Sequence, residues 1–297
     1  MQFFQSVACR GKTPSTARCG WRLLGPMLAF ALMVVARLAQ AGDAPDTVPL
    51  QIPNLASLPA GEMGESIIRG RAYLAKTGEL LPAFVGNGLT CKNCHLGNDT
   101  EVGVVANAAP FVGVVAGFPQ YRSRDGAVNL LEQRINSCFE RSMNGKPLPL
   151  DHPAMVDMVA YMTWLSQGVP VGSVVAGHGM PQLVLARDPD MAQGKAIYQA
   201  KCLACHGVTG AGLRGTDGGY VFPPLWGPQS FNIAAGMARH FTAAGFIKYK
   251  MPLGQGNSRS DDEAWDVAAY VITQERPDFA GKTKDWPGGD KPKDARY

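Results

Sequence analysis

The sequence shows little net charge once its first 41 residues are set apart. Those residues hold five basic side chains and no acidic one, so the 256 residues that follow carry 23 basic and 24 acidic side chains, a formal net charge of −1. A nearly neutral chain offers no general attraction to nucleic acid or to an anionic membrane surface. Any binding site for an anion must therefore be local.

Long apolar runs are also scarce. The one long run extends from Leu23 to Val35 and leads into Ala39-Gln40-Ala41, a small-x-small pattern typical of signal-peptide cleavage. A membrane-spanning helix needs about 20 apolar residues, and this run is shorter and is followed by Arg37. We therefore expect residues 1–41 to be a secretory signal peptide and the mature chain to be a periplasmic protein without a membrane span. A retained membrane anchor is the alternative.

Cysteine is too scarce to form a disulfide framework. Two of the seven cysteines, Cys9 and Cys19, fall within the predicted signal peptide, and four of the other five lie in the CxxCH motifs at 91–95 and 202–206. Exported proteins usually pair their cysteines, so the fifth, Cys138, is an odd thiol that needs an explanation.

Each CxxCH motif predicts a covalently attached haem. Two cysteines one helical turn apart can form thioethers to the two vinyl groups, and the histidine reaches the iron from the same side. A zinc site would place its CxxC pairs roughly 15 to 20 residues apart, whereas Cys94 and Cys202 are separated by 108. A thioredoxin-like motif would not explain a histidine after both pairs. We expect two haem c groups, held by Cys91, Cys94, His95, Cys202, Cys205 and His206.

The regions around the two motifs form an internal repeat. Residues 157–161 (DMVAY) resemble residues 266–270 (DVAAY), and apolar spacing of three and four around each predicts an amphipathic helix. Pro153 suits the first turn of one helix, and Ser260 with Glu263 predicts a capping box on the other. Each half is therefore expected to end on a helix.

A second helical stripe precedes each motif. One comprises Met63, Ile67, Gly70 and Leu74, and the other Met191, Gly194 and Tyr198. A glycine within a helix costs stability unless another element packs closely against it. The two glycines therefore predict that the first and last helices of each half cross.

This arrangement resembles class I cytochrome c domains, and the resemblance implies a mainly α fold of two such domains, each wrapped around one haem. We expect an N-terminal domain at 42–170 with haem 1 and the active site, a linker at 171–188, and a C-terminal domain at 189–297 with haem 2. The tail from Pro277 onward is expected to be an irregular wrap or a frayed end.

The second axial position of each iron decides between electron carriage and chemistry. Met251 precedes a proline and lies 45 residues beyond His206, a placement that resembles the distal loop of ordinary cytochrome c, although methionine also fills cores. Lys250 beside it is a further candidate or a solvated lysine. Cys138 lies 43 residues beyond His95, close to the same position in the repeat. It is either a small buried residue or a thiolate ligand, which would lower the potential of haem 1.

Four arginines surround Cys138 in the sequence, within 20 residues of one another and with acidic residues among them. They predict either a mixed, solvated surface or a pocket for a small dianion, because guanidinium groups bind oxyanions through two parallel hydrogen bonds. The four are Arg122, Arg124, Arg134 and Arg141.

The two CxxCH motifs, the stretches FPQYRSRDG at 118–126 and INSCFERSMNG at 135–145, and the Lys250-Met251 pair resemble the dihaem thiosulfate dehydrogenase family. The resemblance covers essentially the whole mature chain. It implies oxidative coupling of two thiosulfates to tetrathionate with release of two electrons, a reaction that some family members favour in reverse. Electrons would pass through haem 1 and haem 2 to a small periplasmic redox protein such as another c-type cytochrome.

The resemblance also implies roles for individual residues. His95 and Cys138 would bind the iron of haem 1, and His206 with Lys250 or Met251 would bind that of haem 2. The substrate contacts would be Arg124, Arg134 and Ser142, so that Cys138 and these three form the catalytic set.

Three other functions are compatible with two haems. A non-catalytic electron carrier predicts methionine or histidine at both distal positions, which Cys138 argues against. A haem subunit of a larger sulfur-oxidising complex would need a carrier protein for activity. A dihaem peroxidase would need an open or histidine-ligated iron and acid–base groups that the sequence does not reveal.

Overall fold

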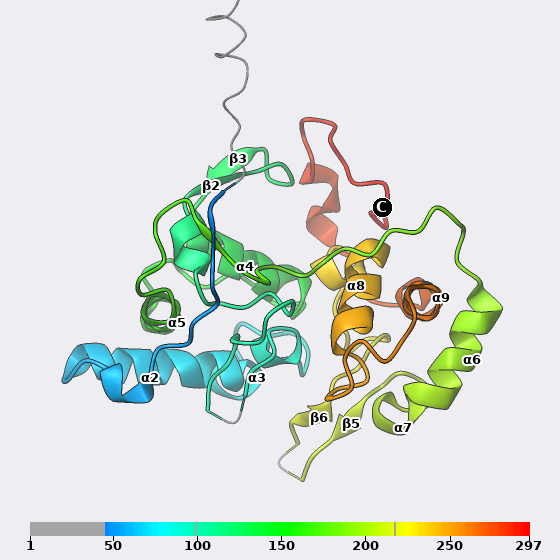
Figure 1. Ribbon diagram of the computed structural model, residues 1–297, viewed down its shortest axis with the longest axis horizontal. Helices are drawn as coiled ribbons and strands as arrows, with labels where there is room; N and C mark the ends of the chain where they lie inside the picture. The colour runs from blue at the N-terminus through cyan, green and yellow to red at the C-terminus, as the bar shows by residue number, and fades with distance from the viewer. Residues whose placement is uncertain (1–44, 99, 217) are drawn as a thin grey trace, which may run out of the picture. The chain divides into compact units, whose positions relative to one another are not determined.

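In the described part of the chain, short helices dominate the fold (Figure 1). Long loops and three two-stranded sheets connect them. The computed structural model describes residues 45–98, 100–216 and 218–297, so the predicted signal peptide lies outside the described residues. Within the described part, none of the helices is both long and apolar enough to cross a membrane.

The first half of the described chain, up to the end of α5, surrounds the first CxxCH motif. Its elements are β1 (Thr47–Val48), η1 (Leu55–Ser57), α2 (Glu62–Ala75), α3 (Thr77–Leu80), η2 (Cys91–Asn93), η3 (Val114–Gly117), β2 (Gln120–Arg122), β3 (Ala127–Asn129), α4 (Leu131–Arg141) and α5 (Pro153–Leu165). Strands β2 and β3 form an antiparallel hairpin that leads directly into α4.

The second half has the same order of helices around the second motif. Its elements are β4 (Val174–Val175), α6 (Met191–Lys201), α7 (Leu203–His206), β5 (Leu213–Arg214), β6 (Tyr220–Phe222), η4 (Gly236–Ala238), α8 (His240–Lys250), α9 (Asp261–Thr273) and η5 (Ala280–Lys284). The predicted helix signals are confirmed, because Pro153 opens α5 and Ser260 forms a capping box with Glu263 at the start of α9.

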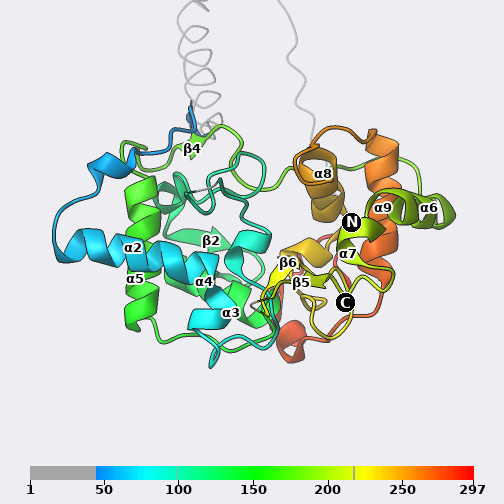
Figure 2. The ribbon, with the colours of Figure 1, turned by 90° about the horizontal axis from the view of Figure 1, so that it is seen from below.

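The predicted helix crossings are present in both halves. Figure 2 shows α2 lying across α5, and a β-carbon at Gly70 would be only 1.9 Å from the carbonyl oxygen of Asp157. In the second half α6 packs on α9, and a β-carbon at Gly194 would be 2.2 Å from the carbonyl oxygen of Asp266. Because Asp157 and Asp266 are equivalent in the sequence repeat, the repeat is also a structural one.

The first member of each predicted stripe is not part of the core. Met63 is 58% exposed and Met191 is 40% exposed, whereas Leu74 and Tyr198 are each only 1% exposed. Both methionines lie in the first turn of their helices, before the crossing point. The apolar stripe is therefore longer than the part of the helix that the crossing helix covers. The buried part of each stripe begins after its methionine.

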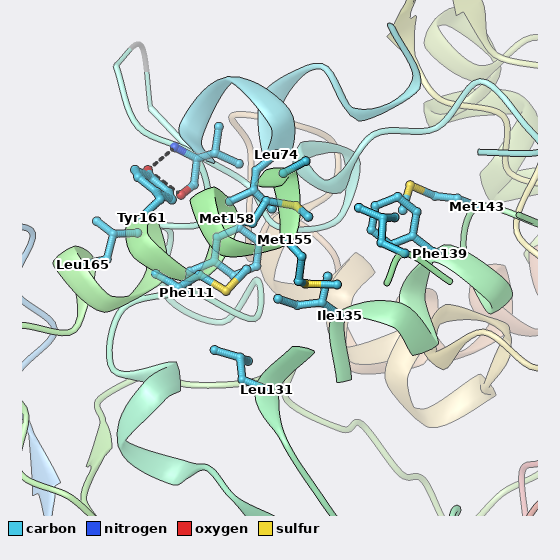
Figure 3. Packing of buried hydrophobic residues seen from close by; sticks show 14 of the residues in the cluster. Leu74, Phe111, Leu131, Ile135, Phe139, Met143, Met155, Met158, Tyr161 and Leu165 are labelled. Atoms are coloured by element: carbon cyan, nitrogen blue, oxygen red, sulfur yellow. Dashed lines mark hydrogen bonds between the residues drawn. The ribbon is translucent and has the colours of Figure 1, made fainter. Parts of the chain in front are cut away.

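The main core joins α2, α4 and α5. Figure 3 shows Leu74, Ile135, Met155 and Met158 directed into one cluster. The Tyr161 hydroxyl lies at its edge, where it accepts a hydrogen bond from the Val102 N–H and donates to the buried Glu101 carboxylate. Phe231, Ala235 and Ala238 of the second half also pack in this cluster. The first-half core is therefore completed by residues that follow the second CxxCH motif.

The segment at 171–188, predicted as the linker, contains β4, which pairs in parallel with β1 of the first half. The domain boundaries themselves stay a prediction. The C-terminal tail wraps onto the chain, because Trp286 is buried and its backbone N–H donates to the carbonyl oxygen of Arg124 over 2.8 Å. The alternative of a frayed end was therefore wrong.

Candidate functional site

The first CxxCH motif presents its histidine in a fixed orientation. The Nδ1 atom of His95 lies 2.7 Å from the carbonyl oxygen of Ala109, and the ring stacks on Phe111 with centroids 4.5 Å apart. Because a carbonyl oxygen can only accept, Nδ1 carries the proton and the Nε2 lone pair is left for a metal. The imidazole is therefore prepared to bind iron.

Helix α4 places Cys138 beside its core residues, because Cys138 lies seven residues after the buried Leu131 and directly before the buried Phe139. Arg134 and Cys138 are four residues apart and therefore lie next to each other on the helix surface. The Nη1 atom of Arg134 donates a hydrogen bond to the Cys138 sulfur over 2.9 Å.

This environment favours a thiolate at Cys138. Burial by itself would raise the pKa of the thiol, but the charge of Arg134, its hydrogen bond to the sulfur and the nearby His95 outweigh it and lower the pKa to about 6. By contrast, burial raises the pKa of Cys91 and of Cys94 to about 12. His95, the other predicted axial ligand of haem 1, is thus within electrostatic reach of Cys138.

The predicted substrate contacts lie around α4 but differ in their partners. Arg134 touches the Cys138 sulfur directly. Arg124 donates to the carbonyl oxygen of Ala234 over 2.5 Å and lies over the ring of Trp286, 4.7 Å from its centroid. Ser142 follows α4, is half-buried, and its hydroxyl has no hydrogen-bond partner among the described residues. That hydroxyl is available to a ligand.

The other two arginines of the cluster have different surroundings. Arg141 forms a two-pronged ion pair with Asp285 over 2.8 and 2.9 Å. Arg122 is half-buried and makes no hydrogen bond or ion pair within the described chain. The sequence revealed neither the pairing of Arg141 nor the isolation of Arg122.

The second CxxCH motif repeats the arrangement of the first. The Nδ1 atom of His206 lies 2.9 Å from the carbonyl oxygen of Pro223, which again leaves Nε2 for a metal. Burial lowers the pKa of His206, which favours the neutral imidazole that metals require. Because both histidines are oriented by backbone carbonyls, no side-chain motif could have identified these partners.

A cavity of about 790 Å³ lies beside the second motif. Its walls include Cys202, Cys205 and His206, with apolar side chains such as Phe246 and Val267. Thiols, an imidazole and an apolar enclosure of this size fit a covalently held haem.

The cavity also distinguishes the two candidate distal ligands. Met251 is one of its lining residues and Lys250 is not. Lys250 is the last residue of α8 and is half-buried, and burial lowers the pKa of its amine. In this conformation Met251 is therefore the candidate that faces the haem 2 site.

The two motifs border the same cavity. Cys94 and Asn93 of the first motif line it together with Cys202, Cys205 and His206 of the second. The two predicted haem sites are therefore neighbours, an arrangement suited to passing electrons from one to the other. The metal-ligand and substrate roles of these side chains remain predictions.

Comparison with known proteins places both halves among cytochromes. Residues 83–171 match the family described as SoxA/TsdA, cytochrome c domain, and residues 189–271 match cytochrome c oxidase, cbb3-type, subunit III. These two matches confirm the predicted pair of cytochrome c domains.

Individual relatives agree along nearly the whole chain. A thiosulfate dehydrogenase from Allochromatium vinosum is 61% identical over 260 residues, which cover 88% of this chain and 96% of that protein. One from Psychrobacter arcticus is 46% identical over 83% of this chain and 74% of that protein. A solved structure, the "as isolated" thiosulfate dehydrogenase TsdBA from Marichromatium purpuratum, aligns with a TM-score of 0.72 and 37% identity over 77% of this chain. This chain spans only 50% of that longer polypeptide.

Proposed function

This chain belongs to the thiosulfate dehydrogenase family, and from that premise we propose that its first haem centre couples two thiosulfates into tetrathionate. The chain is a dihaem cytochrome c enzyme that oxidises thiosulfate. In the proposed coupling the two terminal sulfurs each lose one electron and form one S–S bond, with no proton or oxygen exchanged. The same residues would serve the reverse reaction, in which tetrathionate takes up two electrons.

We assign the haem-binding roles from the donor sets described above. Haem 1 would be held by Cys91, Cys94, His95 and Cys138. Haem 2 would be held by Cys202, Cys205 and His206, with Met251 or Lys250 on its distal side. When bound, the two haems supply one-electron acceptors next to the substrate and next to a redox partner.

The observation that carries the proposal is the contact between Arg134 and Cys138. A buried thiolate is costly unless a cation or hydrogen bond stabilises it, and Arg134 supplies both. An electron carrier needs no such thiolate. We therefore assign Cys138 as the group next to the substrate sulfur.

Arg124, Arg134 and Ser142 would bind the sulfonate end of thiosulfate. Guanidinium groups match pairs of oxyanion oxygens, and the free Ser142 hydroxyl can donate one further hydrogen bond. Binding at these residues would orient the terminal sulfur of thiosulfate toward Cys138.

The electron partner and the compartment are also proposals. We propose that electrons leave through haem 2 to a small c-type cytochrome, and that the chain acts in the periplasm after cleavage near Ala41. Cell fractionation and the N-terminal sequence of the isolated protein test the second statement.

An assay with one purified protein tests the proposed chemistry. Thiosulfate with an artificial one-electron acceptor should form tetrathionate without a second protein, and two acceptor molecules should be reduced per tetrathionate. Turnover that depends on an added carrier protein would instead favour a subunit of a larger sulfur-oxidising complex.

A further inference from the structure

The four arginines around Cys138 differ in how their charges are balanced. Arg134 contacts the Cys138 thiolate, and Arg141 is matched by Asp285, whose side chain is 3% exposed. Each of these two guanidiniums therefore already has a close sulfur or carboxylate partner.

Among the described residues, the positive charge of Arg124 has no carboxylate closer than that of Asp285, which it shares with Arg141. Its hydrogen bond goes to a neutral backbone carbonyl, and its distance to Asp285 is 3.9 Å, a longer contact than the two that Arg141 makes with the same carboxylate. One carboxylate thus serves two guanidiniums.

Arg122 makes no hydrogen bond or ion pair in the described chain. It ends strand β2, and β2 lies beside α4 in both views of the ribbon (Figures 1 and 2). Burial and the charge of Arg134 lower the pKa of Arg122, whereas Asp125 and, less strongly, Cys138 raise it, so all three lie within electrostatic reach of Arg122. The hydrogen bond that the Asp125 carboxylate accepts comes from Asn129.

A half-buried guanidinium that makes no hydrogen bond is unfavourable unless a ligand accepts hydrogen bonds from it. The four guanidiniums of the cluster interact with two carboxylates among the described residues, those of Asp125 and Asp285, so two positive charges are left for one thiosulfate dianion.

We propose that Arg122 is a third substrate-binding arginine, which together with Arg124 matches the two negative charges of thiosulfate beside Cys138. This inference rests on the proposed function and extends it to a residue outside the predicted catalytic set. It also explains why four arginines are clustered here: one holds the thiolate, one anchors the C-terminal tail, and two receive the substrate.

The test compares Arg122→Gln and Arg122→Lys with the parent at fixed ionic strength. Arg122→Gln should raise both the KM for thiosulfate and the inhibition constant of sulfate, an unreactive dianion, by about tenfold or more, since a charge-assisted hydrogen bond is lost. The kcat should change much less, because this binding is common to the ground and transition states. Arg122→Lys should recover part of the loss, because lysine keeps the charge but not the planar fork.

Lys195→Gln is the matched control, since it removes one positive charge from the exposed face of α6. It should leave both constants unchanged. Unchanged constants in an active Arg122→Gln variant would overturn the inference alone, whereas a parent that does not oxidise thiosulfate would overturn the proposed function as well. If the glutamine variant does not fold, a parental KM and sulfate constant in Arg122→Lys would overturn the inference.

Discussion

Asp285 in the C-terminal tail forms a bidentate ion pair with Arg141 in α4, three residues beyond Cys138. The side chains are 3% and 10% exposed, so both charges are largely withdrawn from water. The hydroxyl of Tyr297 also donates to the Asp285 carboxylate. The tail of the second half therefore anchors the helix that carries the proposed catalytic thiolate.

Asp285→Asn should destabilise the folded protein by roughly 3 to 5 kcal/mol, because it leaves the charge of Arg141 buried without a partner. Urea unfolding of the haem-loaded protein measures the change. Asp290→Asn, an exposed position in the same tail, is the control and should have little effect. Equal unfolding midpoints for Asp285→Asn and the parent would show that the ion pair contributes nothing.

Gly70→Ala should destabilise the protein by about 1 to 3 kcal/mol even though alanine favours helices, because its β-carbon would collide with the backbone of α5. Gly78→Ala in α3 is a matched control, since the nearest atom to its β-carbon would be 3.5 Å away. Thermal unfolding should separate the two variants. Similar midpoints for both would contradict the close crossing of α2 and α5.

The helices and their crossings could be predicted from the sequence because they depend on local spacing. Glycine at 70 and 194 signalled the two close approaches, and the cap at Ser260 is a short-range pattern. Apolar periodicity did not predict that Met63 and Met191 are exposed, because spacing alone does not show how far along a helix its crossing partner extends.

The parts of the site that escaped prediction are long-range contacts. Arg141 and Asp285 are 144 residues apart, and neither has a periodic pattern that would pair them. The carbonyl oxygens of Ala109 and Pro223 orient the two histidines through backbone atoms that every residue type possesses. The cluster of arginines was visible in the sequence, but not how its members divide between partners.

His240 gives the stability of the second half a dependence on pH. Burial lowers its pKa below the usual value, against the opposing effect of a 2.8 Å contact with the carbonyl oxygen of Trp265. The unfolded chain therefore takes up the proton first, so stability is complete above about pH 6.5 and is lost as the pH falls through the folded pKa. His240→Gln should show a smaller fall in its urea midpoint on acidification than the parent. An equal fall would assign the dependence to other groups.

The distal side of haem 2 offers a soft thioether and a harder amine in adjacent residues. Met251 suits reduced iron and Lys250 suits oxidised iron, so we expect the ligand to depend on the redox state. Met251→Gly should change mainly the spectrum of the reduced protein, and Lys250→Gly mainly that of the oxidised protein. Identical spectra for the parent and both variants in both states would exclude these residues as ligands.

Cys138→Ala should keep both covalent haems and lose nearly all thiosulfate oxidation. The haems are retained because Cys138 lies outside both CxxCH motifs, whereas the reaction loses the thiolate that Arg134 holds next to the substrate. Haem staining and intact mass establish the haem content, and turnover with an artificial acceptor gives the rate. The haem 1 spectrum should change as well, because the proposed ligand is gone.

Arg124→Ala is the informative comparison for Cys138→Ala, because it removes a binding group and leaves the thiolate in place. It should raise KM more than it lowers kcat, with a loss of about tenfold to a hundredfold in kcat/KM for one charge-assisted hydrogen bond. The two variants thus separate chemistry from capture of the dianion. If Cys138→Ala oxidises thiosulfate at the parental rate with a parental haem 1 spectrum, Cys138 is neither ligand nor reactant, and the reaction must use other groups around the arginine cluster.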